Sequence, residues 1–326
     1  CFKTMARDKR TALWVWLIFL SATVDVEGFN LDVESRLLYR GPTGSGFGAS
    51  LDFHRATNGG GAGLVVGAPF ALDEAAGSVP TGAVFRCPAQ DGLGANSTCH
   101  RLPLKLPDAK ANQMMGATVR TSPLEDLIVA CAPRYWYKGL KGFIESWNLV
   151  GNCLLARKNM TRIQEFSPCK DRQFRRAAWF EEGFCQAGTS AAFTQKGDIV
   201  FGAPGSYLWE GQIYSIDRLT LELGQTSQRQ NYFDDYSGAS VAAGDLSGSG
   251  DADYVIGGPR AKRIMGLVSI VNKNMNFITE LIGEQLASGF GSSLCVTDVN
   301  GDGRADLLIG APYFSVLSGP TMQGDV

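Results

Sequence analysis

The chain has 326 residues, of which 44% are hydrophobic and 40 are glycine, and its 30 basic and 32 acidic residues leave a net charge of −2. A chain of this size and composition can bury one large hydrophobic core or two smaller ones. The balanced charge argues against a nucleic-acid surface and against a polybasic membrane patch. The high glycine content is typical of an all-β fold with many tight turns.

Residues 1–28 are predicted to be upstream sequence followed by a secretory signal peptide that starts at Met5. Three basic residues precede the apolar run 12–22, and small residues suit cleavage before Phe29. The run is too short for a membrane span. We therefore expect residues 29–326 to be extracytoplasmic, or to be the ectodomain part of a longer protein.

Seven cysteines follow the expected cleavage site, and six of them form close pairs in the sequence, which favours disulfides in a secreted chain. These are Cys87 and Cys99, Cys131 and Cys153, and Cys169 and Cys185. Spacing alone leaves the connectivity open. Cys295 stands on an apolar strand pattern and is expected to be a buried free thiol. The chain has only two histidines and no Cys-x-x-Cys motif, which argues against a zinc site. Asn96 and Asn159 each begin a sequence motif for N-glycosylation.

A unit of short strands recurs five times along the chain. Each copy has a glycine-containing entry, an apolar strand, a polar loop, a second strand that ends in Gly-Ala-Pro or a close variant, and a third strand led by glycine. Copies are expected at about 33–95, 103–155, 180–220, 232–275 and 284–326. Repeats of this size and strand content indicate a β-propeller, in which neighbouring units stack around an axis. We expect a partial propeller; a complete five-bladed domain is the alternative.

The fifth copy contains the most informative loop of the chain, which runs from Asp298 to Asp306 and reads Asp-x-Asn-x-Asp-Gly-x-x-Asp. Calcium prefers several oxygen ligands, and alternating loop positions supply them. The expected ligands are the side chains of positions 1, 3, 5 and 9 and the backbone carbonyl of position 7, which are Asp298, Asn300, Asp302, Asp306 and Arg304, respectively. Because an apolar run ended by Gly and Pro follows, the loop is expected to join two strands of a hairpin.

A weaker calcium loop is expected in the fourth copy. Positions 1 and 9 keep carboxylates, while positions 3 and 5 are serines, which are neutral ligands. The five residues are Asp245, Ser247, Ser249, Asp251 and Asp253. Such loops have no open coordination position that catalysis would need, so we expect a structural role.

Several motifs together resemble integrin α subunits from Phe29 to about Phe314. Phe-Gly followed by Gly-Ala-Pro is the FG-GAP repeat of that family. The other matching segments are 29–32, Cys131–Ala132–Pro133, 183–186, 205–212 and 233–235. The resemblance implies a seven-bladed all-β propeller, of which this chain would carry blades one to four and most of five. It also implies calcium in the loops and disulfides at the three cysteine pairs. The same resemblance implies that this part of the chain lies on the extracellular side of a single-pass plasma-membrane protein at the cell surface.

Integrin α subunits pair with an integrin β subunit and bind extracellular matrix or cell-surface ligands. In the Arg-Gly-Asp class, acidic α residues hold the ligand arginine, since a guanidinium pairs with carboxylates in a two-pronged fork. Asp234 matches one such carboxylate, and Tyr207, Trp209 and Glu210 match the loop that lines the same pocket. A further acidic position of that class is Ala192 here.

The resemblance also includes departures. Aromatic residues that cage a basic side chain of the β subunit in this family are replaced by Ala49, Ala117, Ala239 and Ser292. No Ser/His/Asp or zinc constellation is visible, so we expect a binding module and no enzyme. The alternative is a secreted FG-GAP propeller that accompanies a hydrolase or binds carbohydrate.

Overall fold

The computed structural model describes residues 38–55, 61–73, 77–88, 98–124, 127–141, 144–157, 160–171, 181–226 and 234–316. The predicted signal peptide and the predicted glycosylation sites Asn96 and Asn159 lie outside these residues. Within the described ranges, no helix is long and apolar enough to cross a membrane. The strands described below all belong to one compact unit.

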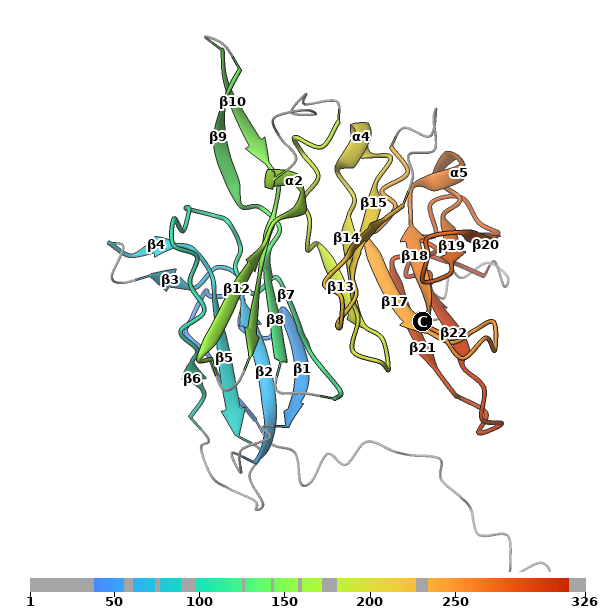
Figure 1. The fold of residues 1–326 in the computed structure, drawn as a ribbon, viewed down its shortest axis with the longest axis horizontal. Helices are drawn as coiled ribbons and strands as arrows, with labels where there is room; N and C mark the ends of the chain where they lie inside the picture. Colours follow the sequence, from blue (N-terminus) through green and yellow to red (C-terminus); the bar gives the residue numbers. More distant parts are fainter. Residues whose placement is uncertain are drawn as a thin grey trace, which may run out of the picture. The chain divides into compact units, whose positions relative to one another are not determined.

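Four antiparallel sheets of four strands each follow one another along the chain (Figure 1). The first contains β1 (Ser50–Arg55), β2 (Ala62–Ala68), β5 (Ala83–Pro88) and β6 (His100–Arg101). The second contains β7 (Thr118–Thr121), β8 (Leu127–Ala132), β11 (Asn152–Arg157) and β12 (Arg162–Phe166). The third contains β13 (Ser190–Phe193), β14 (Ile199–Ala203), β15 (Gln212–Ile216) and β16 (Leu223–Gln225). The fourth contains β17 (Ser240–Gly244), β18 (Asp253–Gly258), β19 (Leu267–Val271) and β20 (Phe277–Ile282).

The first two strands of a fifth sheet are β21 (Ser293–Thr297) and β22 (Asp306–Gly310). Two hairpins, β3 (Leu72–Asp73) with β4 (Val79–Pro80) and β9 (Trp136–Lys141) with β10 (Ile144–Leu149), lie in the connections. The described parts of the connections also contain three single-turn helices, α2 (Pro168–Asp171), α4 (Ser206–Trp209) and α5 (Ala261–Ile264). The outer strands β6, β12, β16 and β20 begin beyond the C-terminal boundaries that the sequence predicts for the first four repeats.

The innermost strands pack against one another in chain order, from β1 through β7, β13 and β17 to β21. The second strands β8, β14 and β18 each lie between two hydrophobic clusters, one on each face, which is why they read as continuous apolar runs; all six residues of β8 are buried. The outer strand β20 is largely exposed. The prediction of an all-β propeller is confirmed, and the four complete sheets are its blades one to four.

Glycine in the repeat has a direct role where blades meet. A Cβ at Gly67, Gly202 or Gly257 would overlap a backbone carbonyl of the following repeat, that of Gly116, Gly238 or Gly291, respectively. Serines of the innermost strands donate hydrogen bonds to the same carbonyls, with distances of 2.8 Å from Ser50, 2.8 Å from Ser190 and 2.7 Å from Ser240. The Gly-Ala-Pro or Gly-Gly-Pro end of one repeat therefore fits against the glycine-containing entry of the next.

The three cysteine pairings are confirmed as disulfides, Cys87–Cys99, Cys131–Cys153 and Cys169–Cys185. In the second repeat Cys131 replaces the glycine of Gly-Ala-Pro, so a disulfide faces Gly188 of the next repeat.

The prediction of a buried Cys295 is wrong, because its side chain is exposed. Alternate residues of β21 point to opposite faces, and only Leu294 and Val296 pack into the cluster shared with blade four. No strand of the described residues covers the face that carries Cys295.

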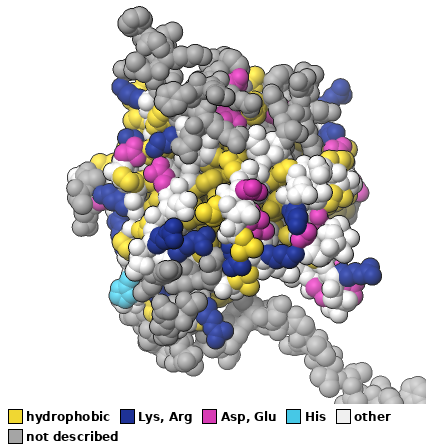
Figure 2. Space-filling model, in the orientation of Figure 1, with side chains coloured by type: hydrophobic (Ala, Val, Ile, Leu, Met, Phe, Trp, Pro, Cys, Tyr) yellow, Lys and Arg dark blue, Asp and Glu magenta, His cyan; other side chains and the backbone are white. Residues whose placement is uncertain are grey.

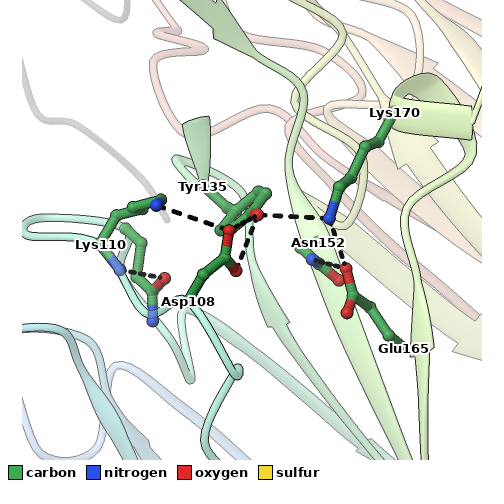
Figure 3. Close-up of polar contacts among 7 residues, drawn as sticks. Asp108, Lys110, Tyr135, Asn152, Glu165 and Lys170 are labelled. Atoms are coloured by element: carbon green, nitrogen blue, oxygen red, sulfur yellow. Dashed lines mark hydrogen bonds and ion pairs between the residues drawn. The ribbon is translucent and has the colours of Figure 1, made fainter. Parts of the chain in front are cut away.

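A polar network fixes the connection between blades one and two (Figure 3). The buried Tyr135 hydroxyl donates to Asp108, at 2.9 Å and 2.7 Å from its two carboxylate oxygens. Lys170 donates to the Tyr135 oxygen at 3.4 Å and to Glu165 at 3.1 Å, and Asn152 donates to the same Glu165 oxygen at 2.7 Å. Burial, followed by the Asp108 hydrogen bond, raises the pKa of Tyr135 to about 12.

Acidic, basic and hydrophobic side chains all occur on the face drawn in Figure 2. On this face, acidic and basic side chains are therefore intermixed and do not form two large regions of opposite charge.

Candidate ligand-binding and metal-binding sites

The connection between β14 and β15 forms an unusual turn at one edge of blade three. Tyr207, Leu208 and Trp209 have φ values of 51°, 57° and 62°, so three consecutive non-glycine residues adopt a left-handed conformation. This conformation costs about 1–2 kcal/mol per residue. Such strain persists where surrounding contacts impose it, and it is concentrated at functional sites.

Blade four repeats the same turn between β18 and β19. Lys262, Arg263 and Ile264 have φ values of 53°, 59° and 67°, and Gly266 donates to the Ala261 carbonyl at 3.1 Å. The sequence carries a signal for this equivalence that the repeat motifs do not include. The interval from Pro204 to Gly211 equals that from Pro259 to Gly266, although the residues between them differ.

Tyr207 is buried, with 7% of its surface exposed, and its hydroxyl donates to Glu182 at 3.2 Å. Glu182 is itself 2% exposed and also accepts from Gln212 and Tyr214, each at 3.3 Å. The Glu182 carboxylate thus connects the left-handed turn to β15 through hydrogen bonds to both. Glu182 was not singled out by the sequence, because it belongs to no motif and lies in a connecting segment.

Glu210 is also buried, at 4% exposure, and points away from solvent. It lines a small polar cavity of about 30 Å³ between blades three and four, together with Gln212, Thr226 and Asp235. Among the four residues predicted to contact a ligand, Tyr207 and Glu210 are therefore buried, and the ligand-binding role of all four stays a prediction.

Asp234 and Trp209 remain accessible. Asp234 has φ 71° and a side chain that is 53% exposed. Its backbone N–H donates to the Leu208 carbonyl at 3.3 Å, and that of Tyr236 donates to the Trp209 carbonyl at 2.8 Å. Trp209 is partly exposed and stacks on Phe184 with ring centroids 6.2 Å apart. Asp234 is thus held beside the left-handed turn, and its carboxylate forms an ion pair with Arg260 of blade four.

The loop from Asp298 to Asp306 joins β21 and β22, as predicted. The Asp298 carboxylate accepts hydrogen bonds from the backbone N–H groups of Gly301 at 2.7 Å, Asp302 at 3.2 Å and Gly303 at 2.8 Å. Asp306 accepts from the N–H of Val299 at 2.9 Å. The loop is therefore folded around its first and last carboxylates.

Three carboxylates and one amide oxygen in this loop are hard ligands of the kind that calcium prefers, and Gly301 and Gly303 permit its turns with φ values of 78° and 83°. In the described ranges, no three His, Cys, Asp or Glu side chains converge closely enough to hold a metal ion. The donor chemistry of the loop fits calcium, and the ligand set of Asp298, Asn300, Asp302, Arg304 and Asp306 stays a prediction.

The loop of the fourth repeat has the same backbone arrangement despite its serines. Asp245 accepts from the N–H groups of Ser249 at 2.9 Å and Gly250 at 2.8 Å, and Asp253 accepts from that of Ser247 at 2.8 Å. The fold of the loop thus depends on its two end carboxylates. The hydroxyl of Ser249 donates to the Asp251 carbonyl, the oxygen expected to bind the ion, at 3.3 Å.

Two ammonium groups flank this fourth-repeat loop. Asp251 forms ion pairs with Lys196 at 2.7 Å and Lys273 at 2.6 Å. Hydrogen bonds from Lys196, then Lys273, lower the pKa of Asp251 to about 2. Neutral serines and nearby positive charge make this loop a poorer fit for a divalent cation than the loop of the fifth repeat.

The candidate ligand and metal regions lie at opposite ends of the strands. The turns α4 and α5 connect the second and third strands of their blades, whereas the metal loops connect the first and second strands (Figure 1). In an antiparallel sheet, successive connections alternate between the two edges. A metal ion in these loops would therefore have no direct contact with a ligand beside Asp234.

Comparison with known proteins agrees with this architecture. The FG-GAP repeat family model matches residues 290–326. Integrin alpha-8 of Homo sapiens is 38% identical over 318 residues, which cover 88% of this chain and 29% of the relative. Integrin alpha-5 of Xenopus laevis is 38% identical over 334 residues, covering 93% and 31%, and integrin alpha-IIb of Homo sapiens is 37% identical over 344 residues, covering 93% and 32%.

The chain therefore spans less than a third of the length of these relatives. The similarity nevertheless extends over most of the chain, and the family model matches the fifth copy of the repeat. Together, the sequence identity, the FG-GAP repeat and the propeller blades show that this chain belongs with the integrin α subunits, as part of their propeller region.

Proposed function

We propose that this chain is the propeller part of a cell-adhesion receptor α subunit, which pairs with an integrin β subunit at the cell surface and binds an extracellular matrix or cell-surface ligand. The observation that carries the proposal is the identity of 37–38% to integrin α subunits over about nine-tenths of the chain. The function follows from membership of that family, because a fold alone does not determine function.

In this proposal the ligand contacts the edge of blades three and four that carries the left-handed turns. Asp234 offers an exposed carboxylate there, and Trp209 offers a partly exposed aromatic surface. A ligand arginine of the Arg-Gly-Asp type would pair with Asp234. Because Glu210 is buried and position 192 is alanine, Asp234 would act without a second carboxylate from either position.

Calcium in this proposal binds the fifth-repeat loop and has a structural role. It would offset the mutual repulsion of Asp298, Asp302 and Asp306 and stabilise the β21–β22 hairpin. The chain contributes the oxygen ligands, and no step at the ligand edge requires the ion.

A secreted FG-GAP module that accompanies a hydrolase or binds carbohydrate is not favoured. The relatives named above are integrin α subunits, and the similarity covers the segments at the proposed ligand edge.

The test is adhesion of cells that express the full-length protein with candidate integrin β subunits to Arg-Gly-Asp and laminin surfaces. Asp234→Ala should abolish adhesion to the Arg-Gly-Asp surface without lowering surface expression. Glu222→Gln is the matched control, because it removes an exposed carboxylate beside the β15–β16 turn, at the opposite end of blade three. Unchanged adhesion of the Asp234 variant would disprove the assignment of the pocket.

A further inference from the structure

The carboxylate expected to receive a ligand arginine already holds an arginine of this chain. Arg260 donates through Nη2 to Asp234 Oδ2, and its guanidinium carbon lies 4.9 Å from the centre of the Tyr236 ring. Arg260 is thus held by an ion pair and by a cation–π contact. Both of its partners come from the segment that follows blade three, whereas Arg260 precedes the left-handed turn of blade four.

This internal pair is placed where a ligand could compete with it. The side chains of Arg260 and Asp234 are 47% and 53% exposed, so water screens the attraction between them. The pair occupies Asp234 Oδ2, and no hydrogen bond to Oδ1 is formed from the described residues. A ligand guanidinium would therefore meet a half-occupied carboxylate beside a fixed positive charge.

Two further basic residues lie on the turn that follows Arg260. Lys262 is paired with Glu280 at 2.9 Å, while Arg263 is exposed. Asp235, the carboxylate next to Asp234 in the chain, is buried, and the ion-pair partner of Asp234 among the described residues is Arg260. A ligand that binds through arginine must share Asp234 with Arg260 or displace it.

We infer that Arg260 is a specificity-determining residue that competes with the ligand guanidinium for Asp234 and lowers the affinity for ligands that depend on arginine. This inference rests on the proposed function. Two unit charges about 4 Å apart in water repel by about 1 kcal/mol, which corresponds to about a fivefold change in affinity. Removal of Arg260 should therefore strengthen arginine-dependent binding by about that factor, most clearly at low ionic strength.

The experiment uses the purified extracellular heterodimer and two probes, a short Arg-Gly-Asp peptide and the same peptide with neutral citrulline in place of arginine. Arg260→Gln and Arg260→Ala should each tighten binding of the arginine peptide about fivefold and leave binding of the citrulline peptide unchanged. In the Asp234→Ala background, removal of Arg260 should not restore binding of the arginine peptide. Arg263→Ala is the matched control, since it removes an exposed arginine of the same turn that has no ion pair with Asp234.

The outcomes separate the two proposals. If Asp234→Ala abolishes binding but neither Arg260 variant tightens it, the pocket assignment holds and the competition is disproved. If Asp234→Ala has no effect on the arginine peptide, the pocket assignment itself fails. A gain with Arg263→Ala equal to that with Arg260→Gln would show a general charge effect and would also overturn the specific role of Arg260. Thermal unfolding of each variant confirms that the variants are folded.

Discussion

The contact between glycines of successive repeats can be tested by adding a single methyl group. A Cβ at Gly202 would overlap the carbonyl oxygen of Gly238 and lie 2.8 Å from its carbonyl carbon, closer than carbon atoms pack in proteins. The nearest obstacle is the backbone carbonyl of Gly238, so a side-chain rotation, such as that of the nearby Ser190 hydroxyl, does not relieve the overlap. Gly202 has no positive φ, so the backbone conformation itself would tolerate alanine.

We therefore expect Gly202→Ala to destabilise the propeller by about 3 kcal/mol, the upper part of the usual range for overpacking. For a domain of this size each kcal/mol lowers Tm by about 2–4 °C, so the expected shift is about 6–12 °C. The assay is thermal unfolding of the purified extracellular heterodimer, followed by circular dichroism. A second readout is the amount of receptor on the cell surface, which should fall with stability.

Gly77→Ala is the matched control for this prediction. Gly77 has φ 77°, and no atom of the described residues lies within 4 Å of the place that a Cβ would take, so alanine there meets only the backbone penalty. That penalty is about 1 kcal/mol, or about 2–4 °C. If Gly202→Ala lowered Tm no more than Gly77→Ala, close fit between blades three and four would not explain the glycine of the repeat.

Two further predictions concern the polar network and the metal loop. Tyr135→Phe should lower the free energy of unfolding by about 1.5 kcal/mol, because it removes hydrogen bonds to a carboxylate that is 48% exposed, and most of this loss should disappear in an Asp108→Ala background. The pKa of Tyr135 rises from 10.0 to about 12 on folding, so the stabilisation by its neutral hydroxyl is complete below pH 10 and is lost as the pH rises through about 12. Ultraviolet titration of the wild type and of Tyr135→Phe measures this pKa, and an ordinary tyrosine value would contradict the prediction. Asp298→Ala should remove the stabilisation by calcium, which is about 2.7 kcal/mol at a calcium concentration of 100 times Kd, whereas Asp245→Ala should remove less; an unchanged calcium-dependent Tm in Asp298→Ala would refute the fifth-repeat site.

The sequence determined the class of fold and the units from which it is built. Apolar runs ended by Gly-Ala-Pro recur with glycine-led third strands, and each run became the second strand of a blade, as β14 and β18 illustrate. The Asp-x-Asn-x-Asp-Gly-x-x-Asp motif and the apolar run after it predicted the calcium-type loop between β21 and β22, because the ligands of such a loop are all close in the sequence. The three disulfides were also visible as close pairs. The outer strands were missed, because they are short or exposed and have no strong apolar pattern.

Only the tertiary structure decided which side chains of the ligand edge face solvent. Tyr207 and Glu210 are separated by two residues, and nothing in their order shows that both turn inward. Their direction depends on the left-handed turn and on Glu182, which is distant in sequence. The Asp234–Arg260 pair likewise spans two blades. Strand periodicity and loop motifs depend on neighbouring residues and can be read locally, whereas burial, ion pairing and exposure, including that of Cys295, depend on the neighbours that folding brings together.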